Sequence, residues 1–201
     1  MKKEAAEHTF LDDSFNDPMT FIDLGACRGE FSNEILNSYR VEKAILVEAN
    51  PTNFNSLKAM PNVKLYNRAA SNKENAVIEF YEDAASPYNG SMYFNYFNGI
   101  KHSIPTISLR QIIEENNISH VDLLKVDVEG AEYDIFENVD DSILAKIGQI
   151  TIEFHDFVDP SYRSRNQNII DKLTKHGFKH TAYKSISYKY GSDHFDVLFY
   201  R

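Results

Sequence analysis

The chain has 201 residues, with 30 acidic and 21 basic side chains and a formal net charge of −9 at pH 7. This length suits one domain with a sizeable core, and the acidic balance argues against a nucleic-acid-binding protein, which normally presents a basic face. The single cysteine cannot form an internal disulfide, and no apolar run approaches the ~18 residues of a spanning helix. We therefore expect a cytoplasmic protein with neither nucleic-acid nor membrane partners.

The chain begins with a polar segment, residues 1–17, that has no apolar signal core. We expect it to be a flexible or helical lead-in to a single domain over residues 18–201. Within that domain, strand patterns and helix patterns alternate, which predicts an α/β fold with a doubly wound, mostly parallel sheet. The expected strands are residues 20–24, 44–48, 63–66, 121–126, 149–154, 178–183 and 194–200, the last two forming an antiparallel hairpin. Helices should begin near Glu30, Thr52, Ser108, Gly130 and Ser161, with Ser108 opening a capping box. Residues 76–81 alternate between apolar and polar side chains, which predicts an additional edge strand after the third strand.

The most informative segment is the first strand, which runs into Asp23-x-Gly25-x-x-x-Gly29 before the pattern turns helical. Such a turn exposes free N–H groups at the positive end of a helix. Glu48 follows Gly29 by 19 residues, at the end of the next apolar run. An acid at that position suits a grip on ribose hydroxyls. The pattern predicts a site for a nucleoside-containing cofactor.

A nicotinamide cofactor is disfavoured because its fingerprint needs glycines where this chain has Cys27 and Glu30. The spacing instead resembles the first motif of class I S-adenosylmethionine-dependent methyltransferases. With three further segments, at residues 47–51, 123–132 and 150–153, the chain resembles the FkbM-type methyltransferase family from residue 21 to residue 157. Cys27 is a departure, since the family more often has Asn there. The resemblance implies a Rossmann-like seven-stranded fold and O-methylation of hydroxyls on sugars, glycans or polyketide-like metabolites.

On this resemblance, the cofactor-binding residues should cluster at the carboxyl ends of the strands. They are Asp23, Gly25, Ala26, Gly29, Glu48, Asn50, Asn67 and Asp127. Glu48 is assigned to the ribose, with a helix cap as the alternative. Asp23 should orient the turn or the methionine amino group. For Asn67, a contact with adenine and a plain turn role remain equally open.

The catalytic candidates are Asp127, Glu129 and His155, with Asp127 as the first choice for the base that takes the hydroxyl proton. Lys125 is unusual in a strand interior, and it should pair with a carboxylate or lower the pKa of Asp127. A divalent cation is a less favoured alternative, with Asp127, Glu153 and His155, and also Asp156, as its ligands. The alternative without a metal is that His155 and Asp156 form a polar strand end that faces water.

Acceptor recognition is assigned to the aromatic, glycine-punctuated segment 85–97, which could equally form a local hairpin, and residues 183–190 offer a second wall. The expected partner is a small-molecule or glycan hydroxyl, and the oligomeric state stays open. Methylation of nucleic-acid bases is disfavoured, because Asp127-Val128-Glu129-Gly130 stands where such enzymes carry an Asp/Asn-Pro-Pro-aromatic segment. Two further alternatives are a non-catalytic partner subunit of the same fold and, more remotely, an NAD-dependent oxidoreductase.

Overall fold

A computed structural model describes residues 1–83, 90–92, 99–156, 160–184 and 195–201. Its largest sheet has seven strands, as expected. They are β3 (Met19–Leu24), β4 (Val41–Val47), β5 (Lys64–Tyr66), β10 (Val121–Val126), β11 (Ile147–Phe154), β12 (Lys179–Lys184) and β13 (Phe195–Tyr200). Their order is β12-β13-β11-β10-β3-β4-β5. β3, β4, β5, β10 and β11 run parallel, and β12 and β13 form the antiparallel hairpin that the sequence predicts.

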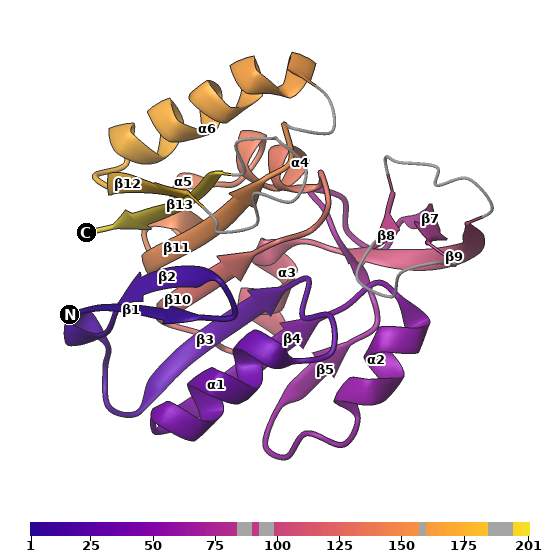
Figure 1. Cartoon of the computed structure of the whole chain (residues 1–201), viewed down its shortest axis with the longest axis horizontal. Helices are drawn as coiled ribbons and strands as arrows, with labels where there is room; N and C mark the ends of the chain where they lie inside the picture. The colour runs from indigo at the N-terminus through magenta and orange to yellow at the C-terminus, as the bar shows by residue number, and fades with distance from the viewer. Residues whose placement is uncertain (84–89, 93–98, 157–159, 185–194) are drawn as a thin grey trace.

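Both faces of this sheet are covered, because successive apolar residues of a strand point to opposite sides. The helices are α1 (Glu30–Ser38), α2 (Pro51–Leu57), α3 (Leu109–Glu115), α4 (Glu132–Glu137), α5 (Asp141–Leu144) and α6 (Arg163–Lys175). Phe21 packs in a cluster with α1 and α2, whereas its neighbour Ile22 packs in a larger cluster with α3 to α6. Figure 1 shows α1 in front of the sheet and α6 above β12. No helix among the described residues is long and apolar enough to cross a membrane.

The first 17 residues, expected as a flexible or helical lead-in, instead form a β-hairpin and one 3₁₀ turn. β1 (Lys2–Ala5) pairs with β2 (His8–Leu11), followed by η1 (Asp12–Ser14). Phe10 anchors the hairpin, since its ring is buried and contacts the rings of Phe15, Phe31 and Tyr39. The Gln149 side chain also bonds the backbone N–H and C=O of Leu11. Apart from Phe15, these partners lie outside the segment, so its polar composition did not reveal them.

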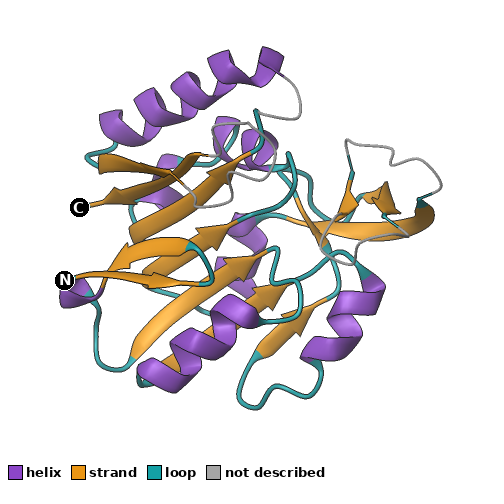
Figure 2. Cartoon of the chain, viewed as in Figure 1, coloured by secondary structure: helices purple, strands orange, loops and turns teal. Residues whose placement is uncertain are grey.

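A second, four-stranded sheet adjoins the first (Figures 1 and 2). It contains β6 (Ala69–Ala70), β7 (Val77–Glu82), β8 (Gly90–Ser91) and β9 (Ile100–Ile107), in the order β6-β9-β7-β8. The strand expected at 76–81 is therefore real, but it belongs to this sheet and is not an edge of the main one. Its partner β9 was not predicted. Most of the aromatic segment 85–97 lies outside the described residues, as does much of 183–190.

The observed helix starts agree closely with the predicted ones where the sequence provides a capping residue. The Ser108 hydroxyl accepts the backbone N–H of Gln111 at 3.0 Å and begins α3. The Gln111 side chain donates to Glu115 instead of returning to Ser108, so only half of the expected capping box forms. α4 begins at Glu132, slightly after the expected Gly130, and α6 begins at Arg163 after the 3₁₀ turn η2 (Pro160–Tyr162).

Candidate functional site

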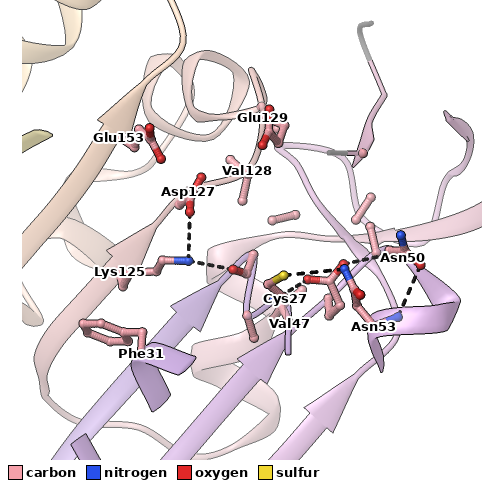
Figure 3. Close-up of a pocket in the computed structure, with 18 of the residues that line it drawn as sticks. Cys27, Phe31, Val47, Asn50, Asn53, Lys125, Asp127, Val128, Glu129 and Glu153 are labelled. Atoms are coloured by element: carbon pink, nitrogen blue, oxygen red, sulfur yellow. Dashed lines mark hydrogen bonds and ion pairs between the residues drawn. The ribbon is translucent and has the colours of Figure 1, made fainter. Parts of the chain in front are cut away.

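A cavity of about 480 Å³ opens at the carboxyl ends of β3, β4, β10 and β11. Two groups of predicted residues line it, and Figure 3 shows Asp127, Glu129 and Glu153 apart from Asn50. We call the part around Gly25, Glu48 and Asn50 the glycine-turn end, and the part around Asp127, Glu129 and Glu153 the acidic end. Ala26 also lines the cavity. Four of the predicted site residues do not line it: Asp23, Gly29, Asn67 and His155.

Gly25 makes the turn at the end of β3 possible. Its φ is +81°, and a Cβ there would lie 1.7 Å from the carbonyl oxygen of Asp127. The backbone N–H groups of Gly25 and Ala26 both donate to the carbonyl of Val47, each at 3.0 Å. Only glycine fits so close to the neighbouring strand end. Gly29 instead faces Met60 and Leu57, so its role is packing at the start of α1.

Glu48 ties the two turns of this end together. Its Oε2 accepts the backbone N–H of Cys27 and its Oε1 accepts that of Asn50, both at 2.7 Å. The side chain is nearly buried, and burial raises its pKa to about 7, although the two amide donors oppose the rise. Each carboxylate oxygen still has capacity to accept one more hydrogen bond. Glu48 is therefore an acceptor held in place at the cavity wall.

Asn50, and not Glu48, is the helix cap. Its Oδ1 accepts the backbone N–H groups of Thr52 and Asn53 at the start of α2. Its Nδ2 is buried at the cavity and has no hydrogen-bond partner among the described residues. The Asn67 side chain donates to the carbonyls of Glu48 and Ala49, at 2.9 and 3.1 Å. Asn67 thus holds the turn after β4 and does not face the cavity.

Cys27, the departure from the family pattern, lies between these groups. The Asn53 side chain approaches its Sγ at 3.6 Å. Burial and the nearby carboxylates of Glu48 and Glu30 raise the pKa of the thiol to about 12. A thiol that stays protonated at neutral pH is a poor nucleophile, so Cys27 is a turn and wall residue.

Lys125 joins the glycine turn to the acidic end. Its Nζ donates to the carbonyl of Gly25 at 2.6 Å and lies 3.3 Å from Asp23 Oδ1 and 3.4 Å from Asp127 Oδ2. Asp23 is fully buried and also accepts the Ser32 hydroxyl at 2.6 Å. Burial alone would raise the pKa of Asp127, but the Lys125 ammonium and the neighbouring histidines hold it well below its usual range. Lys125 therefore has both predicted roles: it pairs with carboxylates and it lowers the pKa of Asp127.

His155 lies behind the acidic end in a cage of carboxylates. Its Nδ1 is 3.1 Å from Glu132 Oε1, and its Nε2 is 3.5 Å from Glu129 and 3.8 Å from Asp127. Burial opposes protonation of the ring, but Glu132 and Glu129 raise the pKa of His155 well above its usual value. Burial raises the pKa of Glu129 to about 8, helped by Asp127 and Glu153. Asp156 pairs with Arg163 at 3.4 Å and lies apart from this group.

His8 is the functional candidate that the sequence did not reveal. It is at the start of β2 and lines the acidic end, with Nε2 3.7 Å from Asp127 Oδ2. Its Nδ1 is 3.4 Å from the Thr151 hydroxyl of β11. Only the packing of the hairpin against the sheet places it there, and no motif around it could have indicated this. Phe80 and Met92 of the small sheet add an apolar wall.

Parts of this chain are similar in sequence to known proteins. A relative in Pseudomonas aeruginosa, the AMB antimetabolite synthetase AmbE, is 42% identical over 71 residues, which are 35% of this chain and 3% of that protein. Methyltransferase 1 of Beauveria bassiana is 25% identical over 173 residues, covering 73% of this chain and 67% of that one.

Among solved structures, the FkbM methyltransferase of Methylobacillus flagellatus has a TM-score of 0.62 at 14% identity. The match covers 95% of this chain but only 46% of the other, so this chain spans about half of that structure. Spermidine synthase from Thermotoga maritima has a TM-score of 0.54 at 13% identity. At these identities the likeness concerns the fold. The family model of the methyltransferase FkbM domain matches residues 23–180, the span that carries the cavity lining except Ala6, Glu7 and His8. This chain therefore belongs to the methyltransferase FkbM domain family.

Proposed function

We propose that this chain binds S-adenosylmethionine and transfers its methyl group to a hydroxyl oxygen of a sugar, glycan or polyketide-like acceptor. The observation that carries the proposal is the pairing at the glycine-turn end: the fixed carboxylate of Glu48 stands beside the unpartnered Nδ2 of Asn50. An acceptor beside a donor matches a ribose, whose hydroxyls both donate and accept.

The cavity also fits the rest of this cofactor. Gly25 lets the backbone approach the ligand closely, since it has no side chain at the turn. The acidic end adds the carboxylates of Glu7, Asp127, Glu129 and Glu153 to the lining. S-adenosylmethionine carries a positive sulfonium and an ammonium, which such a lining attracts. A pyrophosphate would be repelled there, which argues against NAD and against an oxidoreductase.

In this proposal each residue has a separate task. When bound, S-adenosylmethionine supplies an electrophilic methyl group. Glu48 and Asn50 hold the ribose, and Asp23 and Lys125 keep the glycine turn in place from below. Asp127, paired with Lys125 at 3.4 Å, stays ionised and faces the positive part of the cofactor. Catalysis of this kind depends mainly on alignment of the two reactants.

A hydroxyl acceptor must lose its proton, and we assign that proton to the Glu129 carboxylate. Glu129 lines the cavity, whereas Asp127 is committed to Lys125 and His155 does not reach the lining. The His155 ring, 3.5 Å from Glu129 Oε2, holds that carboxylate in position. The apolar wall of Phe80 and Met92 would cover the acceptor and exclude water.

Titration calorimetry with S-adenosylmethionine tests the cofactor. Glu48→Gln should weaken binding by about 2 kcal/mol, or roughly 30-fold in Kd, because a charged hydrogen-bond acceptor is lost. Glu82→Gln is the matched control: Glu82 is also a buried carboxylate, but it pairs with His102 and does not line the cavity. Absence of binding to the unaltered protein would overturn the proposal.

A second assay tests transfer, with labelled methyl groups and a panel of hydroxylated sugars. Glu129→Gln should keep most of the affinity for the cofactor, since three other carboxylates of the acidic end remain in the lining, and lose about 100-fold in turnover. Tight binding of the cofactor with no transfer to any hydroxyl acceptor would favour the non-catalytic partner subunit instead.

A further inference from the structure

One face of the small sheet is turned toward the cavity. Phe80 of β7, Gly90 of β8 and Met92 all line it. Because alternate side chains of a strand share a face, Glu82 lies on the same face of β7 as Phe80. His102 of β9 is directly opposite Phe80, and Gly90 is directly opposite Glu82. Opposite residues of an antiparallel pair have Cβ positions about 5 Å apart, so Glu82 and His102 are immediate neighbours of the cavity lining.

Glu82 and His102 form a hydrogen-bonded pair on this face. His102 Nε2 is 2.8 Å from Glu82 Oε2, and a carboxylate accepts hydrogen bonds, so the ring donates from Nε2. The remaining polar atom of each side chain, His102 Nδ1 and Glu82 Oε1, has no hydrogen-bond partner among the described residues. Neither belongs to the fully buried atoms that lack a partner, so both can be reached from outside. The pair therefore holds two free polar atoms in fixed positions.

The place of this pair in the sheet is unusual for charged side chains. On the same face, Phe80 and Ile104 pack in an apolar cluster. The opposite face of the same two strands carries the ion pair of Glu79 and Lys101, where both side chains are exposed. The Glu82 side chain is only 10% exposed, and a carboxylate that has lost its water is costly even when it has a partner. The backbone ladder of β7 and β9 forms without it, so the fold does not require this cost.

Apolar surface beside fixed hydrogen-bonding atoms matches the surface of a sugar ring. One side of such a ring presents C–H groups, and its rim carries hydroxyls that both donate and accept. Phe80 and Met92 offer the apolar surface. His102 Nδ1 and Glu82 Oε1, next to it, can each accept from a hydroxyl. A mainly apolar acceptor would cover these two atoms without giving them a partner, which is unfavourable.

We propose that Glu82 and His102, together with Phe80 and Met92, form a subsite for a sugar ring of the acceptor. The inference rests on the proposed methyl transfer and narrows its acceptor to carbohydrates. No bond is made or broken at this subsite. The pair binds and orients the sugar, while the proton of the reacting hydroxyl still goes to Glu129.

Two substitutions at His102 separate binding of a sugar from stability of the sheet. In His102→Gln the amide nitrogen takes the place of Nε2 and still donates to Glu82, but no atom remains at the position of Nδ1. In His102→Asn the shorter amide replaces Nδ1 and loses Glu82. His102→Gln should therefore raise the KM of a sugar acceptor about fivefold, as expected for one lost hydrogen bond, with kcat and melting temperature nearly unchanged. His102→Asn should lower the melting temperature more and raise the KM less.

Glu79→Gln is the matched control. It removes a carboxylate from a cross-strand pair on the opposite face of the same strands, and it should change neither the KM nor the affinity for S-adenosylmethionine. Glu82→Gln should raise the KM several-fold while keeping the affinity for S-adenosylmethionine, because Glu82 does not line the cavity around Glu48 and Asn50.

The first measurement is sugar binding to the whole chain by saturation-transfer difference NMR, with and without S-adenosylmethionine. The probes are the methyl α-glycosides of glucose, galactose and mannose at millimolar concentration. At least one should give a signal, and His102→Gln should reduce it. The KM is then measured by transfer of labelled methyl groups to the sugar that binds.

The outcomes distinguish this inference from the proposed function. A sugar that binds through His102 but receives no methyl group would support the subsite and contradict methyl transfer to it. Methyl transfer to a sugar with a KM unchanged in both His102→Gln and Glu82→Gln would overturn the subsite and leave the proposed function standing. The subsite would also be overturned by the absence of a signal from all of these sugars, or by a fall in the melting temperature of His102→Gln as large as that of His102→Asn.

Discussion

The two ends of the cavity are built in different ways. The glycine-turn end uses Gly25, Cys27, Glu48 and Asn50, which are close in the sequence and are joined by backbone amides that donate to Glu48 and Val47. The acidic end brings His8, Asp127 and Glu153 from three separate segments. The positions of these side chains depend on the interactions between their charges and not on backbone hydrogen bonds. We therefore expect the folding stability of the first end to respond to steric changes and that of the second to changes of charge and pH.

The largest effect should come from the turn itself. Gly25→Ala places a Cβ 1.7 Å from the Asp127 carbonyl at a φ of +81°. We expect a loss of about 4 kcal/mol in the free energy of unfolding, measured with urea. Gly148→Ala is the control, because its Cβ would meet nothing closer than 3.5 Å and should cost under about 1 kcal/mol. Equal losses in the two variants would contradict a special role for this turn.

The next effect should come from the lysine between the two ends. Lys125→Met leaves the buried carboxylate of Asp23 and the half-buried one of Asp127 without their shared cation, at a cost of about 3 kcal/mol in unfolding free energy at pH 8. Lys101→Met, which removes an exposed partner of Glu79, should change little.

The loss in Lys125→Met should also depend on pH. A carboxyl whose pKa is depressed in the folded state, as that of Asp127 is, stabilises above its unfolded pKa, and this stability is lost as pH falls through the folded pKa. In the unaltered protein this contribution is constant from pH 8 to pH 5, because the unfolded pKa lies below that range. Without Lys125, burial is left to raise the pKa of Asp127, so protonation of this carboxyl relieves the variant as pH falls and the difference between the two proteins should narrow from pH 8 to pH 5. A difference that is constant over this range would show that the ion pair is not its cause.

A smaller effect concerns the affinity for the cofactor. Because burial raises the pKa of Glu48 to about 7, this carboxyl is partly protonated in the free protein at neutral pH. A ribose that donates to Glu48 favours the ionised form, so S-adenosylmethionine should bind about tenfold more tightly at pH 8 than at pH 6, with proton release below pH 7. Calorimetry in two buffers of different ionisation enthalpy measures this. Glu48→Gln should bind with no such dependence, and a persistent dependence there would assign it to another group.

The smallest effect on the cofactor should come from the apolar wall. Met92→Ala removes side-chain surface from the cavity without touching either carboxylate cluster. We expect less than about a twofold change in the Kd for S-adenosylmethionine and a several-fold rise in the KM of the acceptor, since apolar contact area is lost on that side only. A large change in cofactor affinity would mean that the two ends are not separate in function.

Much of the fold and half of the site could be predicted from local patterns. Glycine turns, caps and apolar runs act over a few residues, and they located the main strands, the turn at Gly25 and the acid at Glu48. The two roles expected for Lys125 also followed, because a buried ammonium must find carboxylates. The pairing of β7 with β9 did not follow, since the choice of a strand's partner depends on which sheet lies nearby.

By itself, then, the sequence determined the family, the positions of the main strands along the chain and the residues of the glycine-turn end. Tertiary structure alone decided that the N-terminal hairpin covers the sheet, that His8 faces Asp127 and that Asp196 stands opposite Glu153. It also decided that Asn67 braces a turn and that His155 lies behind the cavity. The physical reason is one of range: backbone turns are fixed by neighbours along the chain, whereas charges from distant segments meet only when the packed core brings them together.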